Sequence, residues 1–268
     1  MRRPILPVLA VLGGLLAGCD AGTKPGERPE GPRLFIAAPR MDQVLDAHDV
    51  EVVLDLRNYA IGRVHGKDGP HVHVIVDNEP YVAVYDVSAP VRLDPRLMTE
   101  GTHVVRAFPS AGPKDPAGAL HHESRKNPGA YAWVRFHVKK KGGLLAEFDP
   151  KAPLLTYSRP KGEYKVGSPE HAKFMVDFHL ANVKLGPGEY SVRATLDGTV
   201  VSTWDEEIRL GATQEKVART EWATWKPWVL ATPPAAGDHV LVLELIDREG
   251  KPVPGPFNRT ERKFKVVP

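Results

Sequence analysis

The feature that most constrains the fold of this chain is a duplicated series of short strand signals separated by turn residues. Residues 50–56 alternate between apolar and polar side chains, which is typical of a half-buried β-strand. Asp197-Gly198 turns a hairpin in the second half where Asp77-Asn78 turns one in the first half. Gly237-Asp238-His239-Val240 likewise resembles Gly101-Thr102-His103-Val104. The repeated unit is about 115 residues long, too long for a solenoid repeat, and it predicts two similar domains in tandem.

The composition favours strands over helices in both halves. The chain contains 26 Pro and 24 Gly among 268 residues, and a proline inside a helix costs about 3 kcal/mol. No segment has a convincing amphipathic helix period. The sequence therefore predicts an all-β chain of two tandem immunoglobulin-like antiparallel β-sandwiches with about seven strands each, at residues 33–142 and 150–268. The pattern also aligns residues 175–178 with residues 53–56.

The N-terminus carries a targeting pattern. Arg2-Arg3 precedes an apolar stretch that ends in Leu16-Ala17-Gly18-Cys19. This motif resembles the lipobox of bacterial lipoprotein signal peptides, in which a Leu and two small residues precede a cysteine. The resemblance implies that residues 1–18 are a cleaved signal peptide and that Cys19 is diacylated through its sulfur. The apolar run is too short to span a bilayer, and residues 19–32 read as a flexible spacer.

The lipobox also bounds the location and the partners. It implies a protein anchored by lipid to a bacterial membrane, facing the periplasm or the cell surface. Asp20 directly after Cys19 resembles the inner-membrane retention signal of enteric bacteria, but that sorting rule does not extend to other groups, so both membranes stay open. Cys19 is the only cysteine, so no internal disulfide can form. Without residues 1–18, 34 basic residues face 33 acidic ones, a net charge of +1. That balance gives no electrostatic footprint for nucleic acid, so the expected partners are the membrane and an envelope protein or glycan.

No catalytic motif stands out in the sequence. It contains no nucleophile elbow, P-loop, dinucleotide fingerprint or His-Glu-x-x-His helix. Both halves resemble immunoglobulin-like modules of bacterial surface lipoproteins, and the stretch from Asp247 to Asn258 resembles one in exported bacterial proteins. The sequence thus predicts a non-enzymatic binding or scaffolding lipoprotein. An envelope hydrolase that acts on a polymer is the weakest alternative.

Histidines on one predicted strand raise a second hypothesis, that of a periplasmic metal-binding protein. His71 and His73 are two residues apart, so their rings project from the same face of the strand. Imidazoles at this spacing can share a copper or zinc ion, with His103 or His121 as a further ligand. In the alternative interpretation both rings face solvent and no cofactor is bound.

A long loop between Pro109 and Gly129 is the predicted binding loop, because long loops on a rigid sandwich often carry binding sites. Its polar candidates are His122, Glu123, Arg125 and Asn127. A solvated connection without a partner remains the alternative.

Three tryptophans in the second half form another candidate surface. Trp222, Trp225 and Trp228 are spaced three residues apart. They could stack on a sugar or close one end of a sandwich core, and the second role is the more common one.

Overall fold

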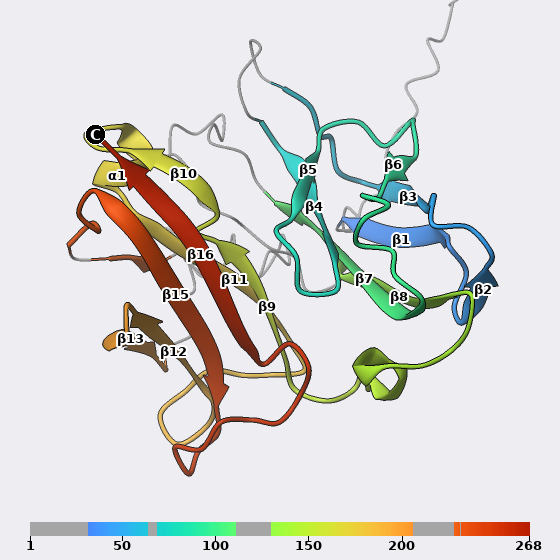
Figure 1. The fold of residues 1–268 in the computed structure, drawn as a ribbon. Helices are drawn as coiled ribbons and strands as arrows, with labels where there is room; N and C mark the ends of the chain where they lie inside the picture. Colours follow the sequence, from blue (N-terminus) through green and yellow to red (C-terminus); the bar gives the residue numbers. More distant parts are fainter. Residues whose placement is uncertain (1–31, 64–68, 111–129, 206–227, 231) are drawn as a thin grey trace, which may run out of the picture.

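The computed structural model describes residues 32–63, 69–110, 130–205, 228–230 and 232–268 (Figure 1). Strands dominate these ranges and confirm the predicted all-β class. Within them, the helical elements are the single turn α1 (Pro169–Ala172) and a 3-10 turn at Leu144–Glu147. In this part of the chain, no helix has the length and apolar character needed to cross a membrane.

The first half forms a sandwich of two sheets, here called sandwich 1. Its three-stranded sheet has the order β1-β3-β6, with bounds Arg33–Ala38, Glu51–Arg57 and Val91–Arg92. Its five-stranded sheet has the order β2-β8-β7-β4-β5, with bounds Gln43–Leu45, Ala132–Val138, Gly101–Ser110, His71–Val76 and Val82–Val84. The inward side chains of the two sheets, among them Val52, Val74 and Phe136, make one buried apolar core.

The second half forms sandwich 2 on the same plan. Its three-stranded sheet has the order β14-β11-β9, with bounds Trp228–Val229, Met175–Ala181 and Leu154–Arg159. Its five-stranded sheet has the order β10-β16-β15-β12-β13, with bounds Gly162–Lys165, Arg259–Val267, Gly237–Ile246, Ser191–Leu196 and Thr199–Trp204. Its core is separate and includes Tyr157, Phe178 and Leu243.

The two sandwiches correspond strand by strand, because adding eight to each label of sandwich 1 gives the sheet orders of sandwich 2. Each holds eight described strands rather than about seven. One pair in each is also parallel, β2 with β8 and β10 with β16, whereas the expectation was antiparallel throughout. After β1 and β9 the chain passes into the opposite sheet, where it adds a short edge strand of three or four residues. Such short segments leave little periodic signal in a sequence.

An aspartate–histidine pair locks the hairpin turn of sandwich 1 to the neighbouring strand. Asp77 has a φ of 49°, and its Oδ1 accepts a hydrogen bond from the backbone N–H of Val104 at 2.8 Å. Its Oδ2 lies 2.7 Å from Nδ1 of His103. Nε2 of His103 lies 2.8 Å from the carbonyl oxygen of Thr99. Both ring nitrogens face acceptors, so the ring is satisfied as a protonated imidazolium.

Sandwich 2 repeats this arrangement with an aspartate, a histidine and a valine at the equivalent positions. Asp197 has a φ of 48°, accepts from Val240 N at 2.8 Å and lies 2.7 Å from Nδ1 of His239. Nε2 of His239 lies 2.8 Å from the carbonyl oxygen of Ala235. The repeated bonds confirm the equivalence of the two turns that the sequence pattern indicates.

The pair of His103 and Asp77 is expected to make the free energy of unfolding depend on pH. Burial alone would lower the pKa of His103, but its bonds to Asp77 and Thr99 and the charge of Asp77 outweigh burial and raise that pKa. The stabilisation is therefore complete below the ordinary histidine pKa and is lost as pH rises through the higher folded-state pKa. We expect His103→Gln to be less stable than wild type at pH 5.5 and to approach it at pH 9. Urea unfolding across this pH range measures the difference in free energy of unfolding between the two proteins. A difference that stays constant with pH would contradict the prediction.

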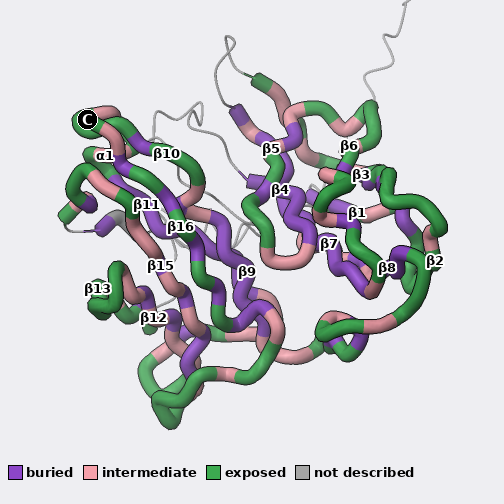
Figure 2. The backbone as a smooth tube through the Cα atoms, in the orientation of Figure 1, coloured by how far each residue is buried: buried purple, intermediate pink, exposed green. Residues whose placement is uncertain are grey.

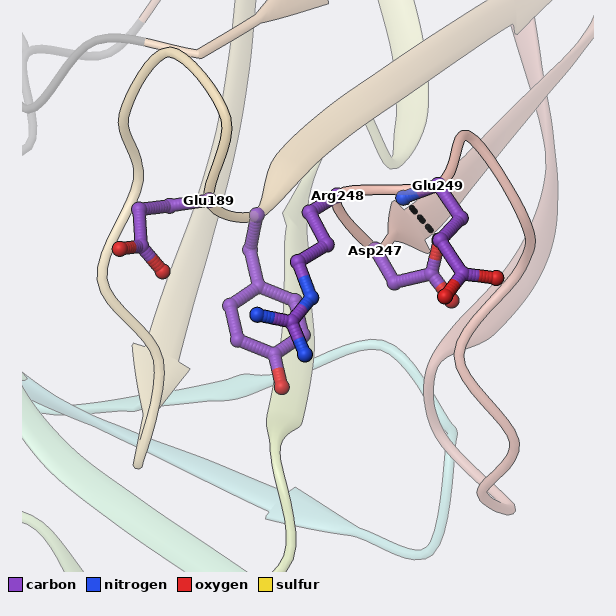
Figure 3. A pocket seen from close by; sticks show the side chains of 5 residues that line it. Glu189, Asp247, Arg248 and Glu249 are labelled. Atoms are coloured by element: carbon purple, nitrogen blue, oxygen red, sulfur yellow. Dashed lines mark hydrogen bonds between the residues drawn. The ribbon is translucent and has the colours of Figure 1, made fainter.

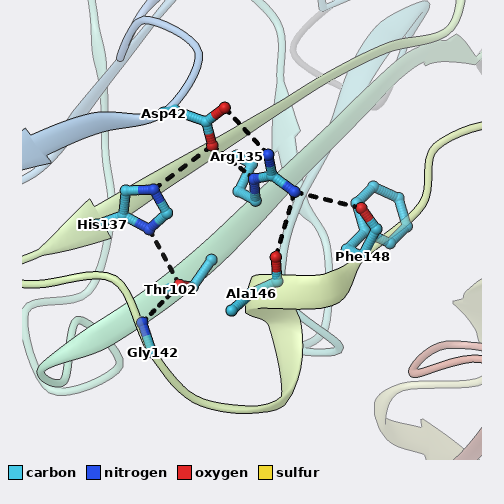
Figure 4. A network of polar contacts seen from close by, with 7 residues as sticks. All are labelled: Asp42, Thr102, Arg135, His137, Gly142, Ala146 and Phe148. Atoms are coloured by element: carbon cyan, nitrogen blue, oxygen red, sulfur yellow. Dashed lines mark hydrogen bonds and ion pairs between the residues drawn. The ribbon is translucent and has the colours of Figure 1, made fainter.

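The connection between the sandwiches is tied to sandwich 1 (Figure 4). The backbone N–H of Thr102 donates to the carbonyl of Gly142 at 2.9 Å, and Gly142 N donates to Oγ1 of Thr102 at 3.1 Å. Arg135 donates from Nη1 to the carbonyls of Ala146 and Phe148, at 3.3 and 3.4 Å. These bonds give the connection a defined path, so it does not behave as a free linker.

The sandwiches pack face to face. The outer side of the β4-β7-β8 sheet meets β9, β11 and one end of β16, through contacts such as His73–Ser158, Phe108–His179 and Asn78–Thr260. In Figure 2 nearly all residues of β4, β7 and β9 are coloured as buried. Val104 of sandwich 1 joins Leu154 and Phe257 of sandwich 2 in one buried cluster. The ring of His179 stacks on Phe108 with centroids 4.6 Å apart. This interface therefore holds the two sandwiches in one orientation.

Candidate functional site

The centre of the interface holds a buried arginine on β7. The guanidinium of Arg106 donates from Nη1 to Oγ1 of Thr156 at 2.8 Å and from Nη2 to the carbonyl of Asp77. It also lies 3.7 Å from the centroid of the Phe257 ring. The residue is fully buried, and burial lowers its pKa to about 10. Thr156 and Phe257 belong to sandwich 2, so this one side chain bridges the two halves.

A second bridge connects the β4–β5 turn with β16. Nδ2 of Asn78 donates to Oγ1 of Thr260 at 2.8 Å, and that hydroxyl lies 3.0 Å from Oδ1 of Asn78. Arg262 donates from Nη2 to the carbonyl of Asn78 at 2.8 Å and lies over the ring of Tyr157. These directional bonds set the register in which the sandwiches dock, because each side chain has one geometry that satisfies it.

The predicted histidine pair lies at the end of the same interface. His71 and His73 are 7% and 2% exposed, and their Nε2 atoms are 3.0 Å apart. Nδ1 of His71 lies 2.7 Å from the carbonyl oxygen of Gly69, and Nδ1 of His73 lies 3.3 Å from Oγ of Ser158. The alternative of solvent-facing rings is therefore wrong, because sandwich 2 covers this face of β4.

Aromatic and cationic groups enclose the pair. The ring of Tyr81 stacks on His73 with centroids 3.7 Å apart, and burial raises the pKa of its hydroxyl. Nε of Arg159 donates to that hydroxyl at 3.1 Å. Nζ of Lys161 lies 3.6 Å from the Tyr81 ring centroid and donates to the Tyr81 carbonyl at 2.7 Å. We call His71, His73, Tyr81, Ser158, Arg159 and Lys161 the histidine cluster.

The structure does not bring His103 to this cluster. In the β4–β7 pairing His71 lies opposite Ser110, seven residues along β7 from His103. Both ring nitrogens of His103 are also engaged, by Asp77 and Thr99. The expectation that His103 is a further metal ligand beside His71 and His73 is therefore wrong. Among the described residues, no group of three or more His, Cys, Asp or Glu side chains is placed to hold a metal ion.

Several other predicted residues lie outside the described ranges. They are Cys19, His121, His122, Glu123, Arg125, Asn127, Trp222 and Trp225. Trp228 begins β14, where it pairs with Val176 of β11.

An open pocket lies at one end of sandwich 2, between the loop before β12 and the turn after β15 (Figure 3). Its volume is about 320 Å³, and it is lined by Glu189, Tyr190, Asp247, Arg248 and Glu249. Oδ1 of Asp247 accepts the backbone N–H of Glu249 at 2.9 Å, which fixes the turn. Sequence reasoning missed this pocket, because its two loops are almost 60 residues apart and only the fold brings them together.

Comparison with known proteins assigns no family. No protein-family model matches the chain, and no curated protein matches it. Fibronectin(III)-like modules of Clostridium thermocellum CbhA align with a TM-score of 0.28 and 10% identity, over 87% of this chain and 94% of that one. The central fibronectin-III array of RIM-binding protein aligns with a TM-score of 0.24 and 10% identity, over 88% and 68%.

A third solved structure is the Bacteroides ovatus protein SGBP-B from a mixed-linkage glucan utilization locus, in complex with a mixed-linkage heptasaccharide. It aligns with a TM-score of 0.22 and 11% identity, over 89% of this chain and 47% of that one. The chain thus spans about half the length of that protein. Likenesses at this level assign no function, so the fold rests on the strand pairing described above.

Proposed function

We propose that this chain is a lipid-anchored envelope protein whose joined sandwiches act as a non-catalytic module that binds a glycan. The pocket between Tyr190 and Arg248 carries this proposal. Binding sites are concentrated in loops that a rigid scaffold positions, and the packed interface supplies such a scaffold. A scaffolding role toward an envelope protein is the alternative that the test below separates.

The pocket offers the groups that a sugar uses. An aromatic ring such as that of Tyr190 provides an apolar face for a pyranose ring, and carboxylates and a guanidinium bond its hydroxyls. Glu189, Asp247 and Glu249 supply the carboxylates, and Arg248 supplies the guanidinium. A volume of about 320 Å³ lies at the lower end of small-molecule sites, which suits a short stretch of a glycan chain.

Calorimetric titration with cellohexaose and chitohexaose tests the pocket. We expect one of these sugars to bind wild type, and Tyr190→Ala to weaken that binding at least about tenfold, because the stacking surface is removed. The control is Arg96→Ala, since Arg96 is an exposed arginine of sandwich 1 that pairs with Asp94. Equal affinity for wild type and Tyr190→Ala, or no binding of either sugar, would contradict glycan binding at this pocket. An envelope protein retained by wild type but not by Tyr190→Ala would support scaffolding instead.

The same samples test the absence of catalysis. We propose no hydrolytic role, so mass spectrometry should recover each hexasaccharide intact after prolonged incubation. Shorter sugars that wild type releases and Tyr190→Ala does not would identify a hydrolase.

The anchor has its own test in the natural host. Acylation requires the thiol of Cys19, so Cys19→Ser is expected to lose radiolabelled fatty acid and to leave the membrane fraction. Two acyl chains hold a protein on a membrane, because each buried CH₂ contributes about 0.8 kcal/mol. A Cys19→Ser protein that still carries label and still sediments with membranes would show that the lipobox interpretation is wrong.

A further inference from the structure

We propose that one end of sandwich 1 rests on the surface of an anionic phospholipid bilayer. This end, here called the β2 patch, combines exposed apolar side chains with exposed cations. Its members are Arg40, Met41, Val44, Lys139, Lys141 and Leu144. The inference rests on the lipid anchor proposed above, but it concerns a surface that is separate from the sugar pocket.

Three apolar side chains of the β2 patch are exposed to water. Leu144 begins the 3-10 turn of the connection and is 80% exposed, while Leu145 and Phe148 beside it pack into the interface cluster. Val44 in β2 is 54% exposed, and Met41 just before this strand is 47% exposed. Neither the core of sandwich 1 nor the interface cluster includes these three side chains. Apolar side chains of this kind are stabilised when they enter the headgroup region of a bilayer.

A hydrogen-bonded network brings these segments to one surface (Figure 4). Nε of Arg135 donates to Oδ1 of Asp42 at 2.5 Å, and its Nη1 donates to the carbonyl of Ala146 at 3.3 Å. The turn before β2 and the 3-10 turn therefore flank the same guanidinium. The backbone N–H of Lys139 donates to the carbonyl of Leu45 at 2.8 Å, which places the segment that follows β8 at the end of β2.

The cations of the β2 patch are available to lipid phosphates. Arg40, Lys139 and Lys141 are exposed, and none of them forms an ion pair with a residue that the structure describes. Lys140, by contrast, pairs with Glu100 at 2.5 Å. Each unpaired lysine or arginine near an anionic membrane is attracted to it, so the patch and the bilayer surface are complementary in charge.

This complementarity alone gives only modest affinity, because Asp46 and Glu147 lie in the same segments and offset part of the charge. The anchor makes a weak contact sufficient, since tethering raises the effective concentration of the patch at the bilayer. Cys19 and Arg33, where β1 begins, are 14 residues apart and span at most about 50 Å. Strand β1 is about 20 Å long and leads directly to Arg40, so the β2 patch lies within reach of the anchored end.

The experiment uses the mature chain from Cys19 to Pro268, which keeps every residue that the structure describes. Its single thiol is coupled to a maleimide lipid, so the tether does not depend on acylation by a cell. The vesicles contain either phosphatidylglycerol with phosphatidylcholine or phosphatidylcholine alone, and mass spectrometry follows the acetylation of each lysine. On the anionic vesicles we expect Lys139 and Lys141 to react at least about fivefold more slowly, the effect of one cation at a charged membrane.

Leu144→Glu tests the apolar part of the contact and spares the core, because this side chain is exposed. We expect it to abolish the protection of both lysines. The matched control is Val200→Glu, which puts the same charge at an exposed valine of β13 in sandwich 2 and should leave the protection intact.

Three results would overturn the proposal. They are equal acetylation rates on both kinds of vesicle, equal protection of the exposed Lys251 in sandwich 2, and unchanged protection in Leu144→Glu. The chemical tether makes the outcome independent of the Cys19→Ser fractionation and of the sugar titration. Failure of the β2 patch is therefore distinguished from failure of the anchor or of glycan binding.

Discussion

Replacement of Arg106 by alanine is expected to lower the free energy of unfolding by about 3–5 kcal/mol, the range for breaking a buried charged network. The change removes a fully buried side chain and leaves a cavity at the centre of the interface. It also leaves the hydroxyl of Thr156 and the carbonyl of Asp77 without their donor, and each lost partner of a buried group carries its own desolvation cost. Urea unfolding of the full chain, followed by circular dichroism, measures the effect.

The matched control for this prediction is Arg259→Ala. The Arg259 side chain is 58% exposed and pairs with Glu244 at the surface of β16, so its loss should cost at most about 1 kcal/mol. Arg106→Met should fall between the two, because it fills most of the volume but donates no hydrogen bond. Equal stability of the Arg106→Ala and Arg259→Ala proteins would show that Arg106 does not hold the sandwiches together.

The sequence allowed the class and the duplication to be predicted because they rest on local signals. The turns at Asp77 and Asp197 share their bonds, and the residues that follow Gly101 and Gly237 form equivalent strands. Each signal needs only a turn residue and a few alternating side chains beside it. Such signals survive divergence, because the backbone conformation at the turn requires them.

The alignment of the two repeats was predicted less accurately at strands β3 and β11. The pattern aligned residues 175–178 with residues 53–56, but Asn58 and Asn182 both end their strands at a φ of 57°. Strand β11 is therefore displaced by two residues from that alignment. Strand alternation has a period of two, so a shift of two residues keeps every side chain on its face and leaves no trace in the pattern.

The interface, and the burial of the predicted histidine pair within it, could not be predicted for a different reason. His71, His73 and Arg106 lie on the face of their sheet that points away from its own core. A polar residue at such a position indicates solvent, and nothing local reveals that another sandwich covers it. Their burial depends on contacts with residues such as Ser158 and Thr156, which are about 50 to 85 residues away in the chain.

Separate expression of residues 31–142 and 150–268 is expected to give two folded but weakened domains. Each sandwich has its own buried core, and among the residues that the structure describes neither core includes one from the other half. Each fragment, however, exposes its side of the interface, including Val104 and Phe108 on one and Leu154 and Phe257 on the other. Both should show β-type circular dichroism and cooperative melting, at temperatures below that of the full chain. Two unfolded fragments would show that the halves depend on each other to fold.

The fragments also separate what Arg106 contributes within sandwich 1 from what it contributes to the contact with sandwich 2. Thr156 and Phe257 belong to the second fragment, so in residues 31–142 alone Arg106 keeps only its bond to the carbonyl of Asp77. The outer face of the sheet is then open to water, which solvates the guanidinium. We expect Arg106→Ala to cost the isolated fragment about 1 kcal/mol or less, the net value of one exposed hydrogen bond. The excess in the full chain measures the coupling that Arg106 provides between the sandwiches. An equal loss in both contexts would place its role within sandwich 1 rather than at the interface.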